Sequence, residues 1–190
     1  MNNDLAVLIT EIDANLSHAE SLAAGLSHQQ FNWRPDQASW SIGQCLSHLN
    51  IVDGQDLAPI REAIAGGKSR QLSGDGPFTY GFFSRQFVTS MEPPAKRKFK
   101  APKNYVPPEE PDPQATLAEF RRISKDLRAL AQSAAGLHLA RVKTSMPALP
   151  PLLRAFVKMP LGARLELITA HDRRHLWQAE AVRNQPYFPL

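Results

Sequence analysis

Apolar residues recur every three or four positions in four separate segments of this 190-residue chain. That spacing places them along one face of an α-helix, whereas a half-buried strand needs an apolar residue at every second position. The sequence shows no strand-like alternation of any length and no internal repeat. The pattern therefore predicts an all-α fold, in which four amphipathic helices bury their apolar faces against one another.

Local signals set the expected ends of these helices. Ser41-Ile-Gly-Gln44 fits a capping box, in which the serine caps a helix and the glutamine reaches back to it. Gly66-Gly67 is expected to end that helix, and Pro59 to kink or shorten it. The predicted helices lie at approximately residues 5–26, 41–65, 114–135 and 162–183.

Proline-rich connections join the helices. A short non-helical link around Pro35 is expected between the first two. Residues 66–113 mix glycine, proline and charge with many aromatics, which disordered segments lack, and a short helix is expected over about 79–91. Residues 137–161 form a second irregular stretch. The expectation is a single domain over 1–190, a four-helix bundle with long crossover connections.

Composition narrows the class of protein. No apolar run reaches the length of a membrane span, and the acidic start, Met1-Asn-Asn-Asp4, predicts no signal peptide. Cys45 is the only cysteine, which excludes an internal disulfide and favours a reducing cytoplasm. A lone cysteine in an apolar stripe is most often core packing, although it is also a candidate soft metal ligand or oxidisable thiol.

The net charge of +4 is unevenly distributed, because acidic residues predominate in 1–60 and basic residues in 61–190. A solubilising surface explains this, and attraction of an anionic ligand is the alternative. The most basic stretch is Lys96-Arg-Lys-Phe-Lys-Ala-Pro-Lys103. Such a run is typical of a solvated loop, so nucleic-acid binding is not expected; a steep salt dependence would be its signature.

Three histidines are the candidate metal ligands. His171 and His175 are four residues apart, so they share one helix face and their rings can reach a single ion. On a helical wheel both face the interior of the bundle, as does His48 on the second helix. Three neutral nitrogens with a fourth position free suit a catalytic site for zinc, nickel, iron or manganese. The alternative is that each is a core histidine bonded to backbone or to a glutamine.

Further polar residues lie on or near the same stripes. Gln44 and Gln178 are candidates to hydrogen-bond a metal-bound water or to hold an imidazole. Asp53 and Asp172 are candidates to orient a histidine N–H, although their wheel positions disfavour this. Arg164 would bind a carboxylate-bearing substrate or thiol cofactor if it lined the cavity, but it is expected to extend to the surface.

The spacing of His171-Asp-Arg-Arg-His175 matches that of the H-E-x-x-H zinc-protease motif, with Asp in place of Glu. Such a protease needs a third ligand further downstream, and only fifteen residues follow His175. Their one acidic residue, Glu180, points away from the pair on the wheel. The sequence therefore disfavours a protease.

Several of these residues fall in motifs that resemble the DinB/YfiT-like superfamily of metal-dependent enzymes. The motifs are Phe31-Asn-Trp-Arg-Pro35, Trp40-Ser-Ile-Gly-Gln-Cys-Leu-Ser-His48 and His171-Asp-Arg-Arg-His-Leu-Trp-Gln178. The resemblance covers residues 1–60 and 114–184. It implies a four-helix bundle, often a homodimer, that holds a divalent metal on His48, His171 and His175.

The resemblance says less about the reaction. Relatives include S-transferases that use mycothiol or bacillithiol, a thiol-dependent isomerase, and proteins described only as hydrolases. The expected function is that of a metal-dependent enzyme acting on a small molecule, either a thiol-dependent S-transferase or a hydrolase. The alternative is a non-catalytic protein that binds metal or ligand.

Overall fold

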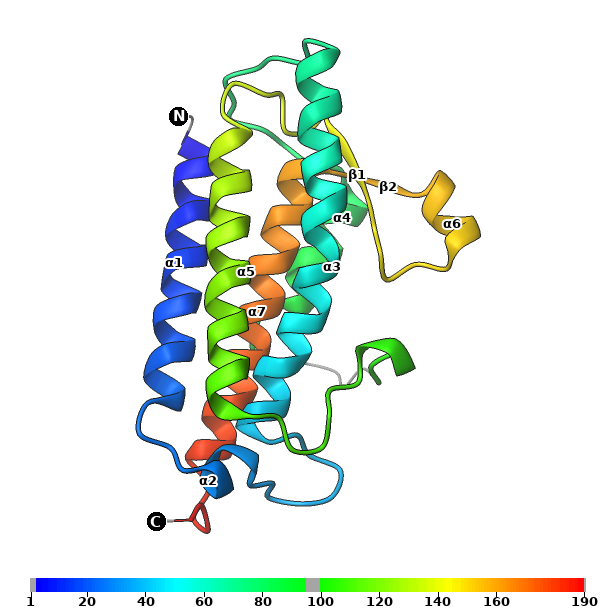
Figure 1. Ribbon diagram of the computed structural model, residues 1–190. Helices are drawn as coiled ribbons and strands as arrows, with labels where there is room; N and C mark the ends of the chain where they lie inside the picture. The colour runs from blue at the N-terminus through cyan, green and yellow to red at the C-terminus, as the bar shows by residue number, and fades with distance from the viewer. Residues whose placement is uncertain (1–2, 95–99, 190) are drawn as a thin grey trace.

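Four long helices lie side by side in the computed structural model, and shorter elements extend from them (Figure 1). The structure describes residues 3–94 and 100–189. α5 and α7 each contact both α1 and α3, so the four helices enclose a common interior. The predicted all-α class is confirmed. The long helices are α1 (Asn3–Ala23), α3 (Ile42–Ser69), α5 (Pro113–Ser133) and α7 (Leu161–Arg183).

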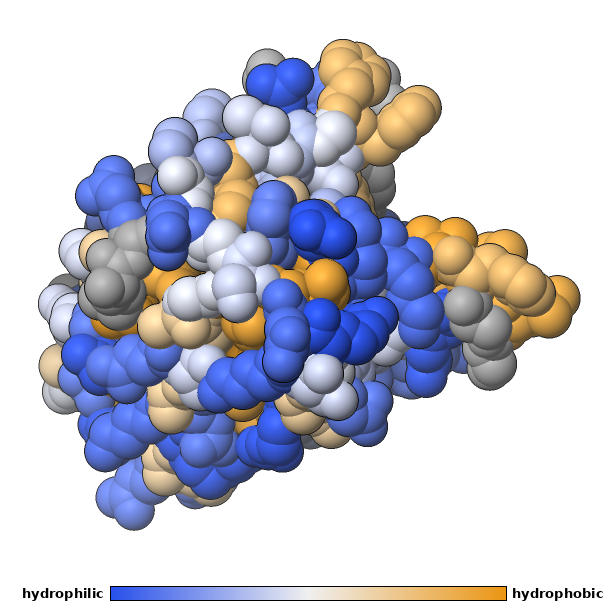
Figure 2. Space-filling model, turned by 90° about the horizontal axis from the view of Figure 1, so that it is seen from above, coloured by the Kyte–Doolittle hydropathy of each residue, from blue (hydrophilic) through white to orange (hydrophobic). Residues whose placement is uncertain are grey.

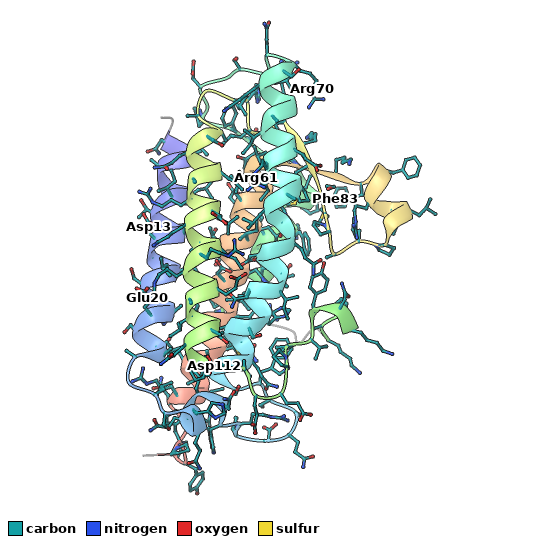
Figure 3. All side chains as sticks on the ribbon, viewed as in Figure 1. Asp13, Glu20, Arg61, Arg70, Phe83 and Asp112 are labelled. Carbon is teal, nitrogen blue, oxygen red and sulfur yellow. The ribbon has the colours of Figure 1, made fainter. Side chains whose placement is uncertain are left out.

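Side-chain caps begin two of these helices. The Ser41 hydroxyl accepts the backbone N–H of Gln44 at 3.0 Å, and the Gln44 side chain accepts the N–H of Ser41 at 3.1 Å. The capping box predicted for α3 is therefore confirmed. At α5, Asp112 accepts the N–H of Ala115 at 2.7 Å, at the start of the helix where Figure 3 labels it.

The predicted end of the second helix was wrong. α3 continues through Pro59 and through Gly66-Gly67 as far as Ser69. A Cβ atom at position 67 would lie 2.8 Å from the side chain of Val142, so glycine there permits close packing instead of ending the helix. Tertiary contact outweighs the helix-propensity cost of about 1 kcal/mol for a glycine.

The connections contain more structure than the sequence indicated. The link after α1 holds the one-turn helix α2 (His28–Asn32), whose own capping box joins Ser27 and Gln30. The expected short helix is α4 (Phe82–Met91), and the one-turn 3-10 helix η1 (Lys103–Tyr105) follows it. Residues 95–99, which include the first half of the basic run, lie outside the described residues.

The second connection carries a small hairpin that periodicity did not predict. β1 (Lys143–Ser145) pairs antiparallel with β2 (Lys158–Pro160), with Thr144 opposite Met159. Three-residue strands are too short to produce a readable alternation, which explains why this prediction was wrong. The helix α6 (Pro151–Phe156) lies between the two strands, and the whole arm projects from the bundle (Figure 1).

Two apolar clusters fill the bundle on either side of a polar centre. One includes Leu5, Ile123 and Ile168, and the other includes Phe31 and Leu176. Because Ile168 and Leu176 belong to different clusters, the stretch of α7 between them crosses the polar region that separates the two clusters. His171 and His175 lie in that stretch.

The surface is mostly polar and cross-linked by exposed ion pairs. Asp13 and Glu20 project from α1, as Figure 3 shows, and pair with Arg128 and Arg121 of α5. Apolar side chains gather on the projecting arm at the right of Figure 2, where Leu152 and Phe156 are exposed. Within the described residues, every helix is too short or too polar to cross a membrane.

Candidate metal centre

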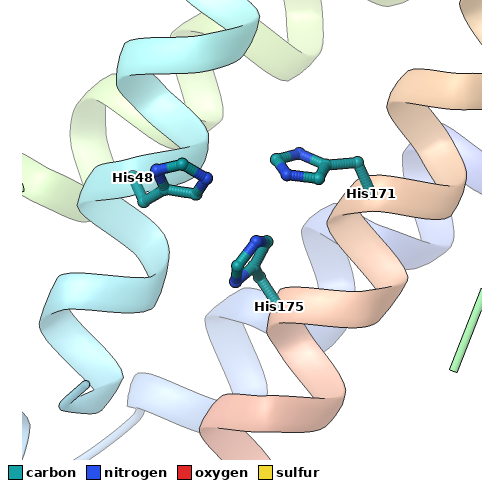
Figure 4. A group of neighbouring side chains, drawn as sticks. All are labelled: His48, His171 and His175. Atoms are coloured by element: carbon teal, nitrogen blue, oxygen red, sulfur yellow. The ribbon is translucent and has the colours of Figure 1, made fainter. Parts of the chain in front are cut away.

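His48, His171 and His175 meet in the interior of the bundle (Figure 4). One ring nitrogen from each residue lies within 4.8 Å of those of the other two. The ring centroids are 4.6 to 5.3 Å apart. α3 supplies the first histidine, and consecutive turns of α7 supply the other two. The predicted convergence of three imidazoles from two distant segments is therefore observed.

The ring of His48 is held by the backbone of the first crossover. Its Nδ1 lies 2.7 Å from the carbonyl oxygen of Tyr105, which can only accept, so Nδ1 carries the proton. That tautomer leaves the lone pair on Nε2, the nitrogen on the other side of the ring. A carbonyl that fixes a histidine in this way is a common feature of metal-binding sites.

Burial favours the uncharged form of all three imidazoles. Burial lowers the pKa of His171 to about 3, and the positive charges of neighbouring groups lower it further. Burial also lowers the pKa of His175 well below its ordinary value. Burial also lowers the pKa of His48, and the hydrogen bond to the Tyr105 carbonyl, which raises that pKa, offsets only part of the effect. A neutral imidazole has a free lone pair, which is the form that binds a metal.

Two ring nitrogens in this group have no hydrogen-bond partner among the residues that the structure describes. They are Nδ1 of His171 and Nδ1 of His175, both buried. Buried polar atoms are nearly always hydrogen-bonded. Three core histidines with all their hydrogen bonds supplied by the protein would therefore not leave two ring nitrogens without a partner. The donor set, three neutral nitrogens in one place, fits a divalent transition-metal ion.

Trp40 covers one side of the centre. Its ring stacks on that of His175, with the centroids 5.7 Å apart and an interplanar angle of 29°. The centroid of the same ring lies 4.8 Å from that of His48. The sequence signal for this residue was its place just before the Ser41 cap, within the motif that ends at His48. The indole shields the two rings from water.

Comparison with known protein families identifies the family of this chain. The family model of the DinB superfamily matches residues 11–179, a span that includes all three histidines. The chain belongs to the DinB superfamily. The resemblance inferred from the motifs is thereby confirmed at the level of the family. The comparisons with curated proteins and with solved structures found no match.

The two glutamines of this DinB-superfamily chain differ in position. The side chain of Gln44 accepts from Ser41 and donates to the carbonyl of Pro108 at 3.4 Å, so the helix cap accounts for it. Gln178 lies one turn after His175, and its side chain raises the pKa of that histidine against the larger effect of burial. Gln178 is thus the one in contact with the centre.

Arg164 does not extend to the surface, contrary to expectation. It is 6% exposed, and two nitrogens of its guanidinium donate hydrogen bonds to the carboxylate of Asp56 in α3. The bond from Nε to Oδ1 is 3.1 Å long. A carboxylate of the chain itself therefore occupies the place that a carboxylate-bearing substrate or cofactor was expected to take. The sequence contained a signal for this pair that was missed. Asp56 lies two turns after His48 on the same face of α3, so residues of opposite charge, Asp56 and Arg164, lie on the inward faces of two helices.

Cys45 is fully buried, and burial raises the pKa of its thiol. It belongs to the apolar cluster that contains Phe31 and Leu176. A thiol in such surroundings is neither a thiolate nor accessible to an oxidant. Core packing, the expected role, is the one that the structure supports.

Asp53 and Asp172 lie closer to the centre than the helical wheel indicated. Both are buried, and one oxygen of each lies within 4.8 Å of a ring nitrogen of His171. Burial raises the pKa of Asp172 to about 7 and that of Asp53 well above its ordinary value. The wheel ranks directions along one helix, but it does not account for side chains that turn toward a neighbouring helix.

Proposed function

We propose that this chain is a metal-dependent enzyme that acts on a small molecule, as a thiol-dependent S-transferase or a hydrolase. His48, His171 and His175 hold the divalent ion, with zinc or nickel favoured and iron or manganese as further candidates. The observation that carries the proposal is the meeting of three imidazoles in the interior of the bundle, where burial favours the uncharged form that binds a metal.

Three histidine ligands leave one position of a four-coordinate ion free for another group. An ion held there would lower the pKa of a water or a thiol in that position, which is the chemistry that a hydrolase and an S-transferase need. The buried thiol of Cys45 does not compete for that position. The nucleophile is therefore a water or a thiol that enters from solvent.

The surrounding residues orient the ligands and limit access to them. The carbonyl of Tyr105 holds the ring of His48, and Trp40 shields His48 and His175 from water. His48 and His175 are 5% and 8% exposed, whereas His171 is only half-buried. A small molecule would accordingly reach the centre along the edge of His171.

Elemental analysis of the purified protein tests the metal site. We expect close to one equivalent of transition metal per chain in the wild type and a large loss in His175→Ala. His18→Ala is the matched control, because His18 is a partly exposed histidine of α1 and its replacement should leave the metal content unchanged. Equal metal in wild type and His175→Ala would contradict the site.

A non-catalytic metal-binding protein is the second candidate function. The deep burial of His48 and His175 favours it, since a closed site retains its ion. Cobalt substitution separates the two functions. An added small thiol changes the visible absorption of the cobalt protein if one coordination position is open, and it leaves the spectrum unchanged if the site is closed.

A further inference from the structure

A pair of carboxyl groups lies in the bundle beside the histidines. Asp53 of α3 and Asp172 of α7 are 2% and 5% exposed, and their side chains are hydrogen-bonded to each other. The amide of Asn15 in α1 donates to Asp172 at 3.5 Å and to the carbonyl of Thr169 at 3.1 Å. Three helices thus hold the pair in place.

Three polar atoms in this cluster are buried and have no hydrogen-bond partner within the described ranges. They are Oδ1 of Asp53, Oδ1 of Asp172 and Nδ1 of His171. A buried polar atom without a partner costs about 1–3 kcal/mol. The needs of the three atoms are complementary, because an imidazole N–H lacks an acceptor and carboxyl oxygens lack a donor.

We infer that Asp53 and Asp172 are positioning residues for His171, whose Nδ1–H they accept directly or through one water. One oxygen of each lies within 4.8 Å of a ring nitrogen of His171, so a small ring rotation or a single bridging water closes the gap. The bond fixes the protonated nitrogen and directs Nε2 toward His48 and His175. This inference rests on the proposed metal site.

The arrangement repeats what the structure already contains at His48. There Nδ1–H is bonded to the carbonyl of Tyr105 and Nε2 is left free. Asp56, the other buried carboxyl group of this region, is engaged with Arg164. The pair Asp53–Asp172 therefore supplies the acceptor for His171, and a carboxylate in that place strengthens the ring as a ligand.

A second cation bound by Asp53, Asp172 and His171 is the rival explanation of the same unpartnered atoms. The side chains of Asp53 and Asp172 are hydrogen-bonded to each other, so one of the two carboxyl groups carries a proton. A second divalent ion would have to displace that proton and break that bond, which disfavours it. The carboxyl pair is therefore assigned to the ring N–H.

Zinc affinity measured by competition with a chelator tests the inference. Asp53→Asn and Asp172→Asn keep the shape of the side chain and remove the carboxyl group, and the expected loss of affinity is about 10–100-fold for the double variant. Asp13→Asn makes the same change at an exposed carboxylate of α1 and should bind zinc as the wild type does. If the wild type binds none of the four candidate metals, zinc, nickel, iron and manganese, the proposed metal site fails; if the wild type and the double variant bind zinc equally, only the present inference fails.

Nitrogen NMR of the zinc-loaded wild type gives a second measurement, which does not depend on whether a variant folds correctly. We expect His171, assigned by loss of its signals in His171→Ala, to carry its proton on Nδ1 with slow exchange, and that proton to exchange faster in the double Asn variant. Coordination of zinc through Nδ1 of His171 would overturn the inference. Two zinc ions per chain would overturn it as well, in favour of the second cation.

Discussion

Replacing Asp56 by leucine should destabilise the protein strongly, because it leaves the guanidinium of Arg164 buried without its counter-ion. Removal of one partner from a buried ion pair costs about 3–5 kcal/mol. For a chain of this size 1 kcal/mol corresponds to a shift in Tm of about 2–4 °C, so we expect a fall of roughly 6–20 °C. Arginine cannot escape the cost by losing its proton.

The reverse change should be milder. Arg164→Met leaves Asp56 alone, and burial raises the pKa of that carboxyl, so it can take up a proton and become neutral. Asp56→Leu combined with Arg164→Met removes both charges, and stability should return to within about 1 kcal/mol of the wild type or rise above it. The order of stability expected is therefore double variant, then Arg164→Met, then Asp56→Leu.

Urea unfolding followed by circular dichroism measures these differences in metal-free protein. The exposed pair Asp13–Arg128 is the matched control, and breaking it by Asp13→Leu should cost less than about 1 kcal/mol. A cost below 1 kcal/mol for Asp56→Leu, with additive effects in the double variant, would refute the account of Arg164 as a buried and paired charge.

Three further outcomes are expected. Cys45 should resist a thiol-reactive dye in folded protein and react once urea unfolds the chain, because it is buried and burial raises its pKa; rapid reaction of native protein would contradict this. Gly43→Ala should destabilise by about 1–3 kcal/mol in urea unfolding, since its Cβ would lie 2.5 Å from the ring of Phe31; wild-type stability would disprove the close contact. Burial raises the pKa of Glu166 to about 7, so the folded state favours its neutral form, and the stability from this residue is present below about pH 4.5 and is lost as the pH rises to about 7. Glu166→Gln should therefore gain stability relative to wild type at pH 8 but not at pH 4, by less than 1 kcal/mol because the side chain is partly exposed, and equal pH profiles would rule this out.

Much of the fold and the candidate site follows from local patterns. Helical periodicity identified the four long helices, and the Ser41–Gln44 pattern located the start of α3. The i,i+4 spacing of His171 and His175, with the inward stripe of His48, predicted which imidazoles meet. These features are readable because each depends on residues within one or two turns of a single helix.

Other features depended on contacts between distant segments. α3 continues past Gly67 because Val142 packs closely against that glycine. The carbonyl of Tyr105 sets the tautomer of His48. The partner of Arg164 and the turn of Asp172 toward Asp53 are likewise decided across α3 and α7.

A helical wheel gives the direction of a side chain from its own axis. It does not say which group on the opposite helix will meet that side chain, nor at what distance. Burial makes that meeting decisive, because a buried charge or ring nitrogen must find a partner inside the protein. The amino-acid sequence therefore determined that the three histidines face the interior, and the packing of the helices decided that Arg164, Asp53 and Asp172 are buried there and how these groups are paired.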